Sequence, residues 1–289
     1  MTAPVTAPTT APDGFPLVAE DVRVSFGGVQ ALQGVSLTVA PGETVGLIGG
    51  NGAGKTTFMD CVSGYVEGSG RLHAFGTDIT ALAPELRPYV GIVRSFQDAR
   101  LYPGLTVIES LLVAVERRRP TPLFGSLLNL GVRPIEVAKR ELVDEVIETL
   151  GLVPYRHKRI RELSTGTRRV VDIATVVVQE PRLVLLDEPT SGLAQRETEA
   201  FGPLLRWLRE RLECAVLLIE HDMPLITSVS DRLYALESGA VIAEGRPADV
   251  IADPRVIASY LGVDETAINR SGAVARPAPR RRRRQLSAR

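Results

Sequence analysis

Continuous apolar runs of strand length recur along the chain and are separated by segments with helical periodicity. LVLLD (183–187) and AVLLIEHD (215–222) are two such runs, and ETVGLIGG (43–50) is a third that ends in glycines. Apolar runs of this kind are typical of strands that a parallel sheet buries on both faces. Strands that alternate with helices predict an α/β fold.

Four further segments also have strand character. VRVSF (22–26) and VSLTV (35–39) are rich in β-branched residues, and VGIVRSFQ (90–97) is a further apolar segment. RLHAFG (71–76) is strand-like but more polar. We therefore expect RLHAFG at the edge of a sheet, where one side of a strand meets solvent.

Two helices are indicated by end signals and by apolar spacing. Thr106 and Glu109 have the spacing of a capping box, which predicts a helix from that point, and the segment 116–134 breaks it. A second helix is predicted over 136–150, closed by Gly151. It is indicated by apolar residues at helical spacing, namely Val137, Leu142, Val143, Val146, Ile147 and Leu150.

Two more helices follow glycine-containing turns. One spans residues 55–63, and the other follows LSTG (163–166) and runs to Gln179. The mostly helical stretch from about residue 99 to 163 interrupts the alternation of strands and helices. We therefore expect it to be a helical subdomain inserted into an α/β core.

Length and composition allow one large domain or two small ones. The chain has 289 residues, of which 44% are hydrophobic, enough for a sizeable core. Residues 1–16 are rich in Pro, Ala and Thr, and we expect them to form a disordered leader. A folded domain is expected over residues 17–264, followed by a basic, disordered tail over residues 265–289.

The net charge of zero hides an uneven distribution. From Ser271 to the end, the chain has seven arginines and no acidic residue. Of the 34 basic residues, 27 therefore remain in the rest of the chain against all 34 acidic ones, a net charge of −7. Five consecutive arginines (280–284) are usually a solvated run, but they are also suited to contact anionic lipid or nucleic acid.

Cysteine usage and hydropathy limit the class of protein. Cys61 and Cys214 lie in apolar runs far apart in the sequence, and no Cys/His spacing suggests a metal site. This usage fits a reducing cytoplasm. No apolar run approaches the roughly 18 residues of a membrane span, and the first residues lack the pattern of a signal peptide. A role at a membrane therefore requires a partner.

A phosphate-binding pattern lies between an apolar run and a helix. GGNGAGKTT (49–57) fits G-x-x-x-x-G-K-[ST], in which backbone N–H groups surround a phosphate. Lys55 is placed to reach the β- and γ-phosphates, and the Thr56 hydroxyl to hold Mg²⁺. A glycine-rich turn with a chance lysine is the alternative, and the strand–loop–helix context counts against it. The residues predicted to bind nucleotide are Gly49, Asn51, Gly52, Ala53, Gly54, Lys55, Thr56 and Thr57.

Polar residues follow three of the apolar runs. Asp187 ends LVLLD, and ligands of open α/β sheets gather at such strand ends, where an Asp is suited to hold the Mg²⁺ shell. Glu188 follows it and is placed to orient and deprotonate a water molecule. Gln97 and His221 end two other strands. Taken alone, each fits a capped strand end or a structural histidine, whereas the P-loop upstream favours a functional interpretation.

LSTGTRRVV (163–171) is a Ser-Thr-Gly turn that precedes a helix. Free N–H groups and the positive end of the helix dipole make such a helix start suitable for an anion. The alternative is an ordinary N-cap, in which Ser164 or Thr165 holds the first turn. Residue types alone favour the N-cap.

Together these motifs resemble those of the ATP-binding subunits of ABC transporters, and within that superfamily the ATPases of branched-chain amino acid importers. Besides the P-loop, the resemblance rests on RSFQ (94–97), DEPTSGL (187–193), LLIEHDM (217–223) and ASYLG (258–262). It covers roughly residues 17–263. It implies a P-loop NTPase fold with a RecA-like core, a small antiparallel β region and an inserted, mostly helical subdomain.

The resemblance also implies roles at the nucleotide site. Phe26 would stack on adenine, for which a core Phe in a strand is the alternative. Gln97 would sense Mg²⁺ and link the site to the membrane partner. His221 would contact the γ-phosphate, so that His221, Glu188 and Lys55 are the expected catalytic residues.

The turn at 163–166 resembles the signature motif of the family. Ser164, Thr165 and Gly166 would accordingly contact the γ-phosphate of ATP bound to a second subunit. The third and fifth positions of the family pattern LSGGQ are here Thr165 and Thr167. The Asp that usually ends the loop after the strand LVLLD (183–187) is here Ala194. None of these changes affects the expected catalytic residues, so we expect a chain that hydrolyses ATP.

The function that the resemblance implies is ATP hydrolysis coupled to transport. ATP and Mg²⁺ are the expected cofactors, with Thr56, Gln97 and Asp187 as the expected metal contacts. The expected partners are integral-membrane permease subunits and a second ABC ATPase subunit, with this chain peripheral to the cytoplasmic face of the membrane. The implied cargo is a branched-chain amino acid or a similar small polar solute.

A soluble ABC ATPase that acts as a nucleic-acid-associated switch is the alternative. The basic tail favours it, but the duplicated cassette of many such relatives is absent, because the sequence has one P-loop. We therefore expect no nucleic-acid partner. The segment PTPLFGSLLNLGVRP (120–134) is expected either to dock on a permease subunit or to fold onto its own domain.

Overall fold

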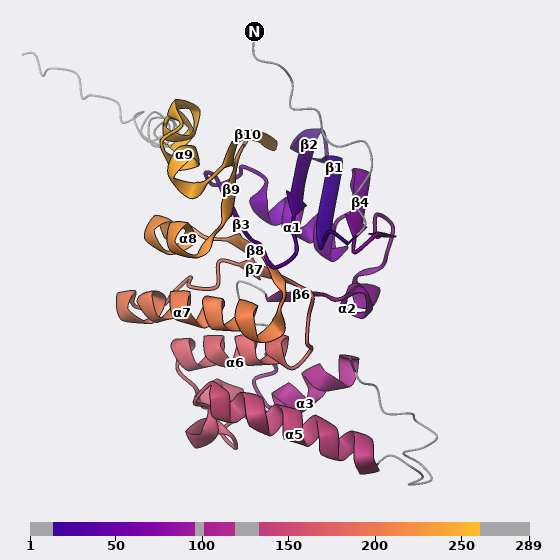
Figure 1. Cartoon of the computed structure of the whole chain (residues 1–289), viewed down its shortest axis with the longest axis vertical. Helices are drawn as coiled ribbons and strands as arrows, with labels where there is room; N and C mark the ends of the chain where they lie inside the picture. Colours follow the sequence, from indigo (N-terminus) through magenta and orange to yellow (C-terminus); the bar gives the residue numbers. More distant parts are fainter. Residues whose placement is uncertain (1–13, 96–100, 119–132, 261–289) are drawn as a thin grey trace, which may run out of the picture.

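The computed structural model describes residues 14–95, 101–118 and 133–260. Figure 1 shows an antiparallel sheet at the top, a second sheet across the middle and helices α3 and α5 at the bottom. Most of the predicted leader, most of the segment 120–134 and all of the predicted tail lie outside the described residues, so the predicted domain boundaries stay predictions.

Four strands form an antiparallel sheet in the order β2-β1-β4-β5. They are β1 (Leu17–Phe26), β2 (Val29–Val39), β4 (Ser69–Ala74) and β5 (Thr77–Asp78). The prediction that the segment 71–76 lies at a sheet edge is wrong, because β4 pairs with β1 on one side and β5 on the other. Phe75 and Gly76 both have positive φ, as in a two-residue type I′ turn that returns the chain along β4.

The second sheet has six strands in the order β10-β9-β3-β8-β7-β6, parallel throughout except for the hairpin of β9 and β10. They are β3 (Thr44–Ile48), β6 (Ile92–Ser95), β7 (Leu183–Asp187), β8 (Ala215–Ile219), β9 (Arg232–Glu237) and β10 (Ala240–Gly245). Every residue of β3, β7 and β8 is buried. The three continuous apolar runs are therefore confirmed as central strands of a parallel sheet.

Alternate residues of the central strands face two separate hydrophobic cores. In β7, Leu183 and Leu185 pack with residues of the antiparallel sheet and α1, whereas Val184 and Leu186 pack with helices on the opposite face. Successive side chains of a strand point to opposite faces, so a sheet covered on both sides needs apolar residues throughout. Cys61 and Cys214 are buried free thiols in these cores, where burial raises the pKa of each to about 11.

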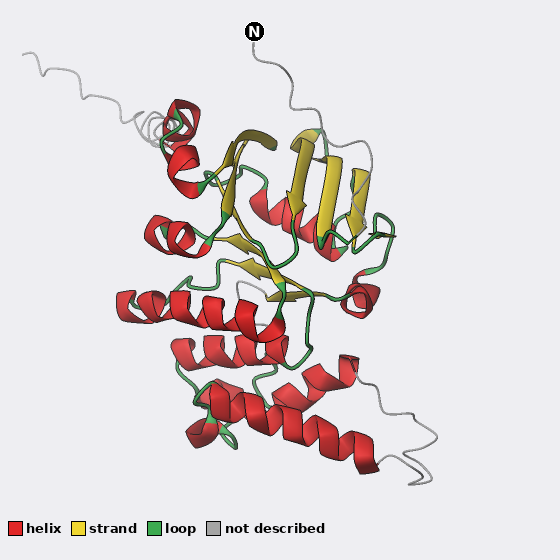
Figure 2. Ribbon diagram, in the orientation of Figure 1, coloured by secondary structure: helices red, strands yellow, loops and turns green. Residues whose placement is uncertain are grey.

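Helices cover both faces of the six-stranded sheet, as the ribbon in Figure 2 shows. They are α1 (Lys55–Ser63), α2 (Arg87–Val90), α3 (Val107–Arg118), α5 (Arg133–Thr149), α6 (Thr165–Val177), α7 (Gln195–Leu212), α8 (Met223–Val229) and α9 (Pro247–Ile251). Short 3₁₀ turns occur at Pro84–Leu86, Val153–Tyr155 and Ile160–Glu162, and a last helical segment covers residues 254–260. Of the helices in the described ranges, none combines the length and hydropathy needed to cross a membrane.

The start of α3 confirms the predicted capping box. Glu109 Oε2 accepts hydrogen bonds from the Thr106 N–H and from the Thr106 hydroxyl, each at 2.8 Å. α6 ends at Val177, two residues before the predicted end at Gln179. The sequence therefore located these helices to within a few residues, because their end signals are local.

The prediction of an apolar stripe on α5 is confirmed for the middle of the helix and is wrong near its start. Val143, Val146 and Ile147 are buried, whereas Val137 is 49% exposed. At 3.6 residues per turn, Val137 lies about 120° around the helix from Val143. It therefore faces away from the core that holds the rest of the stripe.

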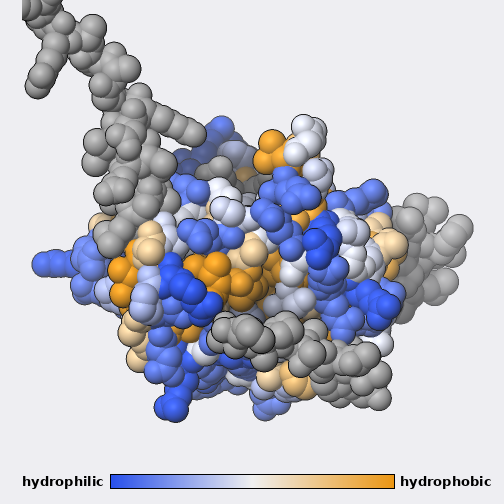
Figure 3. All heavy atoms as spheres, turned by 90° about the horizontal axis from the view of Figure 1, so that it is seen from above, coloured by the Kyte–Doolittle hydropathy of each residue, from blue (hydrophilic) through white to orange (hydrophobic). Residues whose placement is uncertain are grey.

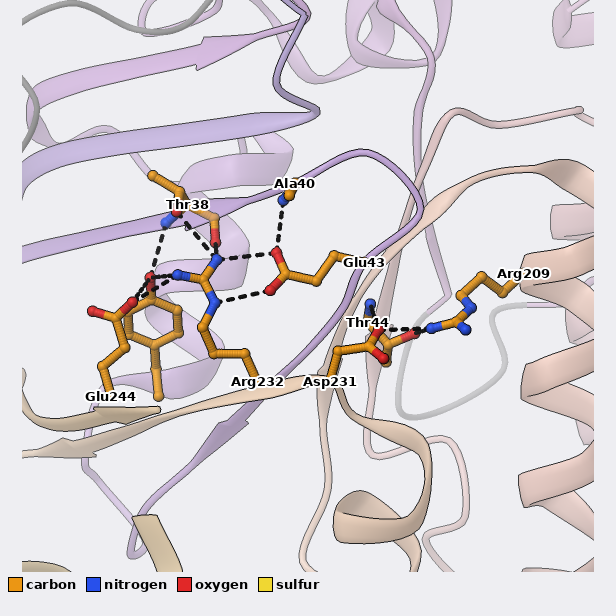
Figure 4. A network of polar contacts seen from close by, with 9 residues as sticks. Thr38, Ala40, Glu43, Thr44, Arg209, Asp231, Arg232 and Glu244 are labelled. Carbon is orange, nitrogen blue, oxygen red and sulfur yellow. Dashed lines mark hydrogen bonds and ion pairs between the residues drawn. The ribbon is translucent and has the colours of Figure 1, made fainter. Parts of the chain in front are cut away.

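Arg232 joins the two sheets through the polar network in Figure 4. Its guanidinium donates hydrogen bonds to Glu43 Oε1 (2.8 Å), to Glu244 Oε1 (2.6 Å) and to the Thr38 carbonyl (2.9 Å). The Tyr234 hydroxyl donates to the same Glu244 oxygen at 2.8 Å. Because Thr38 belongs to β2 and Glu244 to β10, the network holds the edges of the two sheets together.

A hollow of about 780 Å³ lies between these same two edges. Figure 3 views the molecule from this end and shows apolar side chains in the middle of the face, surrounded by hydrophilic ones. The residues that line the hollow include Val18, Ala19, Leu37, Val241, Ile242 and Arg255. The edges of the two sheets are therefore in contact at the Arg232 network and are separated by the hollow beside it.

A buried polar contact connects α6 to β6. The Ser95 hydroxyl donates to Asp172 Oδ2 in the middle of α6, and Arg169 Nη1 lies 3.8 Å from the same oxygen. Burial raises the pKa of Asp172 to about 6, while the bond from Ser95 and the charge of Arg169 act in the opposite direction. At neutral pH, the fold therefore buries an ionised carboxylate against the end of β6.

We predict that Asp172→Asn changes how stability depends on pH. A carboxyl whose pKa rises from 3.8 to about 6 on folding binds its proton more tightly when folded, so its contribution to stability falls as pH rises from about 4 to 6. Asn keeps an oxygen that accepts from Ser95 and removes the buried charge. The variant should therefore gain stability relative to the wild type across this window, by up to about 3 kcal/mol at pH 7.

Denaturant unfolding at pH 4 to 7 measures this difference. Asp249→Asn is the matched control, because the Asp249 side chain is 74% exposed, and it should change stability by less than about 0.5 kcal/mol at each pH. A stability difference for Asp172→Asn that stays constant from pH 4 to 7 would contradict the prediction.

Candidate functional site

Two positions in the loop between β3 and α1 strongly favour glycine. Gly49 has φ +149°, and a Cβ there would lie 2.3 Å from the Leu236 carbonyl oxygen. Gly54 has φ +101°, and a Cβ there would lie 2.7 Å from the Ala31 carbonyl oxygen. Only a residue without a side chain avoids both the close contact and the unfavourable backbone conformation. The path of the loop itself therefore requires two glycines of the predicted motif.

Lys55 begins α1, and its side chain folds back into the loop. Its Nζ donates to the carbonyl oxygens of Gly49 (2.7 Å) and Gly50 (3.1 Å), and the residue is 6% exposed. Burial lowers the pKa of Lys55, and the charges of Glu188 and Asp187 act in the opposite direction. The ammonium is thus held inside the loop near two carboxylates, where phosphate oxygens can replace its carbonyl partners.

The N-terminus of α1 has the character of an anion site. Its N-cap is Gly54, which makes no side-chain cap, and its first turn contains no acidic residue. The backbone N–H groups of that turn are therefore left for a ligand. Of the other predicted binding residues, the structure exposes Asn51, Gly52 and Thr56, half-buries Thr57 and buries Ala53.

Asp187 ends β7 and is held by a buried arginine. Arg94 Nη2 donates to Asp187 Oδ2 (2.8 Å), and Arg94 Nη1 donates to Asp60 Oδ1 of α1 (2.6 Å). Burial raises the pKa of Asp187, and the bond and charge of Arg94 lower it. Arg94 was not among the predicted functional residues, although a charged residue inside the apolar segment VGIVRSF signals a need for a buried partner.

The second oxygen of Asp187 fits a contact to Mg²⁺. Among the described residues, Asp187 Oδ1 is buried without a hydrogen-bond partner, which is unusual for a buried polar atom. Mg²⁺ is commonly bound through one or two carboxylates together with water and substrate phosphates. The described ranges contain no cluster of three His, Cys, Asp or Glu residues that could hold a metal alone. Thr56 would add a hydroxyl, and Gln97 lies outside the described residues.

Glu188 and His221 meet at the ends of β7 and β8. His221 Nε2 lies 2.8 Å from Glu188 Oε1, and because a carboxylate only accepts, Nε2 is the donor in this contact. Glu188 has φ 47°, a left-handed conformation that is uncommon for a residue with a side chain. Strain of this kind is concentrated at functional sites. The two predicted residues are therefore brought into direct contact.

Glu220 supports this pair, although it was not among the predicted functional residues. Its buried carboxylate accepts from the Thr190 N–H (2.9 Å), the Thr190 hydroxyl (2.7 Å) and the His221 N–H (3.0 Å). It thereby ties the loop after β7 to the end of β8. The sequence signal that could have identified Glu220 is an acidic residue that directly follows an apolar run and must therefore find buried partners.

Phe26 lies at the end of β1 and is 52% exposed. The alternative that it is a core phenylalanine is therefore wrong. An exposed aromatic ring is available for stacking on a ligand, and its contact with adenine stays a prediction.

Ser164 is the N-cap of α6. Its Oγ accepts a hydrogen bond from the Thr167 N–H at 3.2 Å, which confirms the N-cap interpretation. That role does not exclude an anion, because Ser164 and Thr165 are exposed and the first turn of α6 has no acidic residue. Thr165 is the first residue of α6 and does not have positive φ. Threonine in place of glycine at 165 therefore causes no backbone strain.

The start of α7 packs against the start of α6. A Cβ on Gly166 would lie 2.2 Å from Glu197 Oε1, so glycine at 166 leaves room for this carboxylate. Glu197 Oε2 accepts from the Ala194 N–H at 3.0 Å. Glu197 therefore satisfies a backbone N–H at the start of α7, where Ala194 has no side chain to act as a cap.

Two family models match the sequence. One, described as ABC transporter, matches residues 32–191, and one described as branched-chain amino acid ATP-binding cassette transporter matches residues 240–266. The high-affinity branched-chain amino acid transport ATP-binding protein LivG of Escherichia coli (strain K12) is 36% identical over 250 residues, 85% of this chain and 97% of the relative. The protein BraF of Pseudomonas aeruginosa, described in the same terms, is 36% identical over 248 residues with the same coverage.

Solved structures of similar chains share the fold. A nucleotide-free ATP-binding cassette from an ABC transporter has a TM-score of 0.74 and 30% identity, over 85% of this chain and 98% of that chain. The ADP conformation of an ATP-binding cassette of an ABC transporter also has a TM-score of 0.74, with 29% identity over 86% and 99% of the two chains. The predicted P-loop fold is thereby confirmed.

We predict that Lys55→Met weakens nucleotide binding and leaves the fold intact. The change removes the positive charge that would meet the phosphates, and a lost charge-assisted hydrogen bond is worth about 1.5–3 kcal/mol. This corresponds to a loss of affinity of about 10- to 150-fold. Titration with a fluorescent ATP analogue measures the affinity, and thermal unfolding checks the fold.

Lys158→Met is the matched control, because Lys158 is exposed and its Nζ lies over the Tyr155 ring at 5.1 Å. It should bind nucleotide as the wild type does. If folded Lys55→Met protein also bound as the wild type does, the assignment of the loop as a phosphate site would be wrong.

Proposed function

Because this chain belongs to the ABC transporter family, we propose that it binds and hydrolyses ATP to power a separate membrane permease. The observation that carries the proposal is that Lys55, Asp187 and Glu188 lie together at the C-terminal ends of the parallel strands. Lys55 is held inside the loop that follows β3, and Asp187 ends β7, which pairs with β8 on the side opposite β3. Glu188 follows Asp187, and its Oε1 lies 2.8 Å from His221 Nε2. Phosphate, metal ion and attacking water each have a complementary group at these strand ends.

In the proposed reaction, each residue has a separate task. Lys55 and the N–H groups at the start of α1 bind the phosphates, and Asp187 presents Oδ1 to the metal site. Mg²⁺, when bound, supplies charge neutralisation of the phosphate oxygens. Glu188 accepts a proton from the attacking water, while His221 fixes the position of one carboxylate oxygen. Glu220 in turn holds His221, so the catalytic pair rests on a buried support.

The proposed assembly contains two such subunits. The start of α6 offers an exposed N-cap serine and a first turn without an acidic residue of its own, which suit the γ-phosphate of ATP bound to a second subunit. Ser164, Thr165 and Gly166 would contact that phosphate. ATP binding would then close the two subunits head to tail, and hydrolysis would reopen them.

The proposed cargo is a branched-chain amino acid or a similar small polar solute. It is supported by the relatives, which are named as branched-chain amino acid transport ATP-binding proteins, and by the family match at residues 240–266. The chain would act at the cytoplasmic face of the membrane through its permease. The alternative of a nucleic-acid-associated switch finds no support among these relatives.

We predict that Glu188→Gln separates binding from turnover. The amide keeps the shape of the side chain and cannot accept the proton of the attacking water. ATP should bind as before, and turnover should fall by about 10²- to 10⁴-fold, the range of a lost general base. ATP-bound dimers should accumulate and be visible by size exclusion, with phosphate release measured in parallel.

Glu148→Gln, on the exposed face of α5, is the control and should turn over as the wild type does. Normal turnover in folded Glu188→Gln protein would assign the base to another residue.

We predict that a negative charge introduced at position 164 repels the ATP bound to the partner subunit and leaves nucleotide binding by its own chain unchanged. Asp and Asn are both good N-caps, so Ser164→Asp and Ser164→Asn should fold alike. Only Asp adds a negative charge close to the proposed phosphate. Two such charges about 4 Å apart repel by about 1 to 4 kcal/mol, more than the helix dipole offsets.

Turnover and dimer formation should therefore collapse in Ser164→Asp and survive in Ser164→Asn. Nucleotide affinity at concentrations too low for dimers should match the wild type in both. A parallel loss of monomer affinity in Ser164→Asp would place the contact within one chain, and full turnover in Ser164→Asp would leave Ser164 as a simple cap.

A further inference from the structure

The last described helical segment, residues 254–260, reaches the first glycine of the P-loop. The Gly49 N–H donates a hydrogen bond to the Tyr260 hydroxyl oxygen at 2.8 Å, across 211 positions of sequence. Burial raises the pKa of Tyr260, and the bond to Gly49 acts in the opposite direction. In Figure 1 this segment lies at the yellow end of the described chain, next to α9. Neither the P-loop motif nor the catalytic groups account for this contact.

The Gly49 amide lies beyond the last strand pairs of β3. The pairing of β3 ends with Ile48 opposite Ala235 of β9 and with Leu47 opposite Ile219 of β8. A buried amide beyond the ladder needs another acceptor, and the Tyr260 hydroxyl provides it. The close approach of Gly49 to the Leu236 carbonyl limits its position from another side. The point at which the P-loop leaves the sheet is therefore fixed from two sides.

Core packing holds the helical segment that carries Tyr260. Val256 is 3% exposed and belongs to the same hydrophobic core as Ala243 and Val250. Tyr260 follows Val256 by four residues and so lies on the same face of the helix. Asp253 begins the helix, accepting at its side chain from the Arg255 N–H and at its carbonyl from the Ile257 N–H. The hydroxyl is thus placed by a seated helix and not by a free tail.

We propose that Tyr260 is a positioning residue of the nucleotide site, through which nucleotide binding and the seating of the helix at residues 254–260 stabilise each other. The inference rests on the proposed function, because it assumes that the loop binds nucleotide. The N–H groups that suit a phosphate lie later in the loop and at the start of α1, so Tyr260 does not compete with the ligand. Coupling between two sites acts equally in both directions, so the nucleotide must also hold the helix.

Tyr260→Phe tests the proposal, because it removes one hydroxyl and keeps the ring. Titration with Mg-ADP, which avoids turnover, should show affinity reduced by at least about fivefold, as expected when a buried N–H loses its partner. Amide hydrogen exchange should be faster in the loop at residues 49–54. In the wild type, Mg-ADP should slow exchange at residues 254–260, and in Tyr260→Phe this slowing should be lost.

Two controls remove a hydroxyl without changing the loop. Ser259→Ala removes the neighbouring hydroxyl, which bonds to the Val256 carbonyl within the helix. Tyr234→Phe removes a buried tyrosine hydroxyl from the network of Arg232 and Glu244. Both should bind Mg-ADP within twofold of the wild type, even where thermal stability falls. An equal loss of affinity in the controls would make the role of Tyr260 merely structural and overturn the proposal.

The outcomes separate this inference from the proposed function. If the wild type does not bind Mg-ADP, the proposed function fails. If the wild type binds and Lys55→Met does not, but Tyr260→Phe binds as the wild type does, only the role of Tyr260 is overturned. Should Tyr260→Phe not fold, exchange in the wild type still decides, because residues 254–260 that gain no protection from Mg-ADP would refute the coupling.

Discussion

The site depends on the register of three parallel strands. Leu47 of β3 and Asp187 of β7 both pair with Ile219 of β8, so the three residues form one row across the sheet. The P-loop, Glu188 and His221 all follow directly beyond this row. Because β3, β7 and β8 are buried at every position, apolar alternation cannot select the register, as it does in a sheet with one wet face. Another interaction must select it.

Polar contacts at the strand ends are suited to that task. Arg94 pairs with Asp187, and Glu220 pairs with Thr190. If β7 slipped by one residue against β6 and β8, both contacts would break, and each buried group left unpaired costs about 1–3 kcal/mol. The contacts suited to specify the register are therefore the ones that hold the residues of the proposed catalytic site. Asp187 Oδ1 is left without a hydrogen-bond partner among the described residues, and it is the oxygen that a metal ion would use.

The sequence predicted what local patterns encode. Strand runs, the capping box at Thr106 and the glycine loop were located because each is read from a few consecutive residues. The supporting contacts were not predicted, because Arg94 meets Asp187 across 93 positions of sequence and Thr190 meets Glu220 across 30. The same limit explains the errors. Whether the segment 71–76 lies at a sheet edge depends on which strand pairs beyond it. Whether Val137 is exposed depends on which face of its helix is covered by the rest of the fold.

The departures from the family pattern can be understood in the same local terms. Threonine at 165 is tolerated because that residue starts α6 without positive φ. Alanine at 194 removes a side chain, but Glu197 supplies an acceptor for the backbone N–H there. Glycine is retained at 166, where a Cβ would collide with that same Glu197 carboxylate. The Glu197 carboxylate thus constrains position 166 far more than position 165, and the start of α6 stays exposed although the motif has changed.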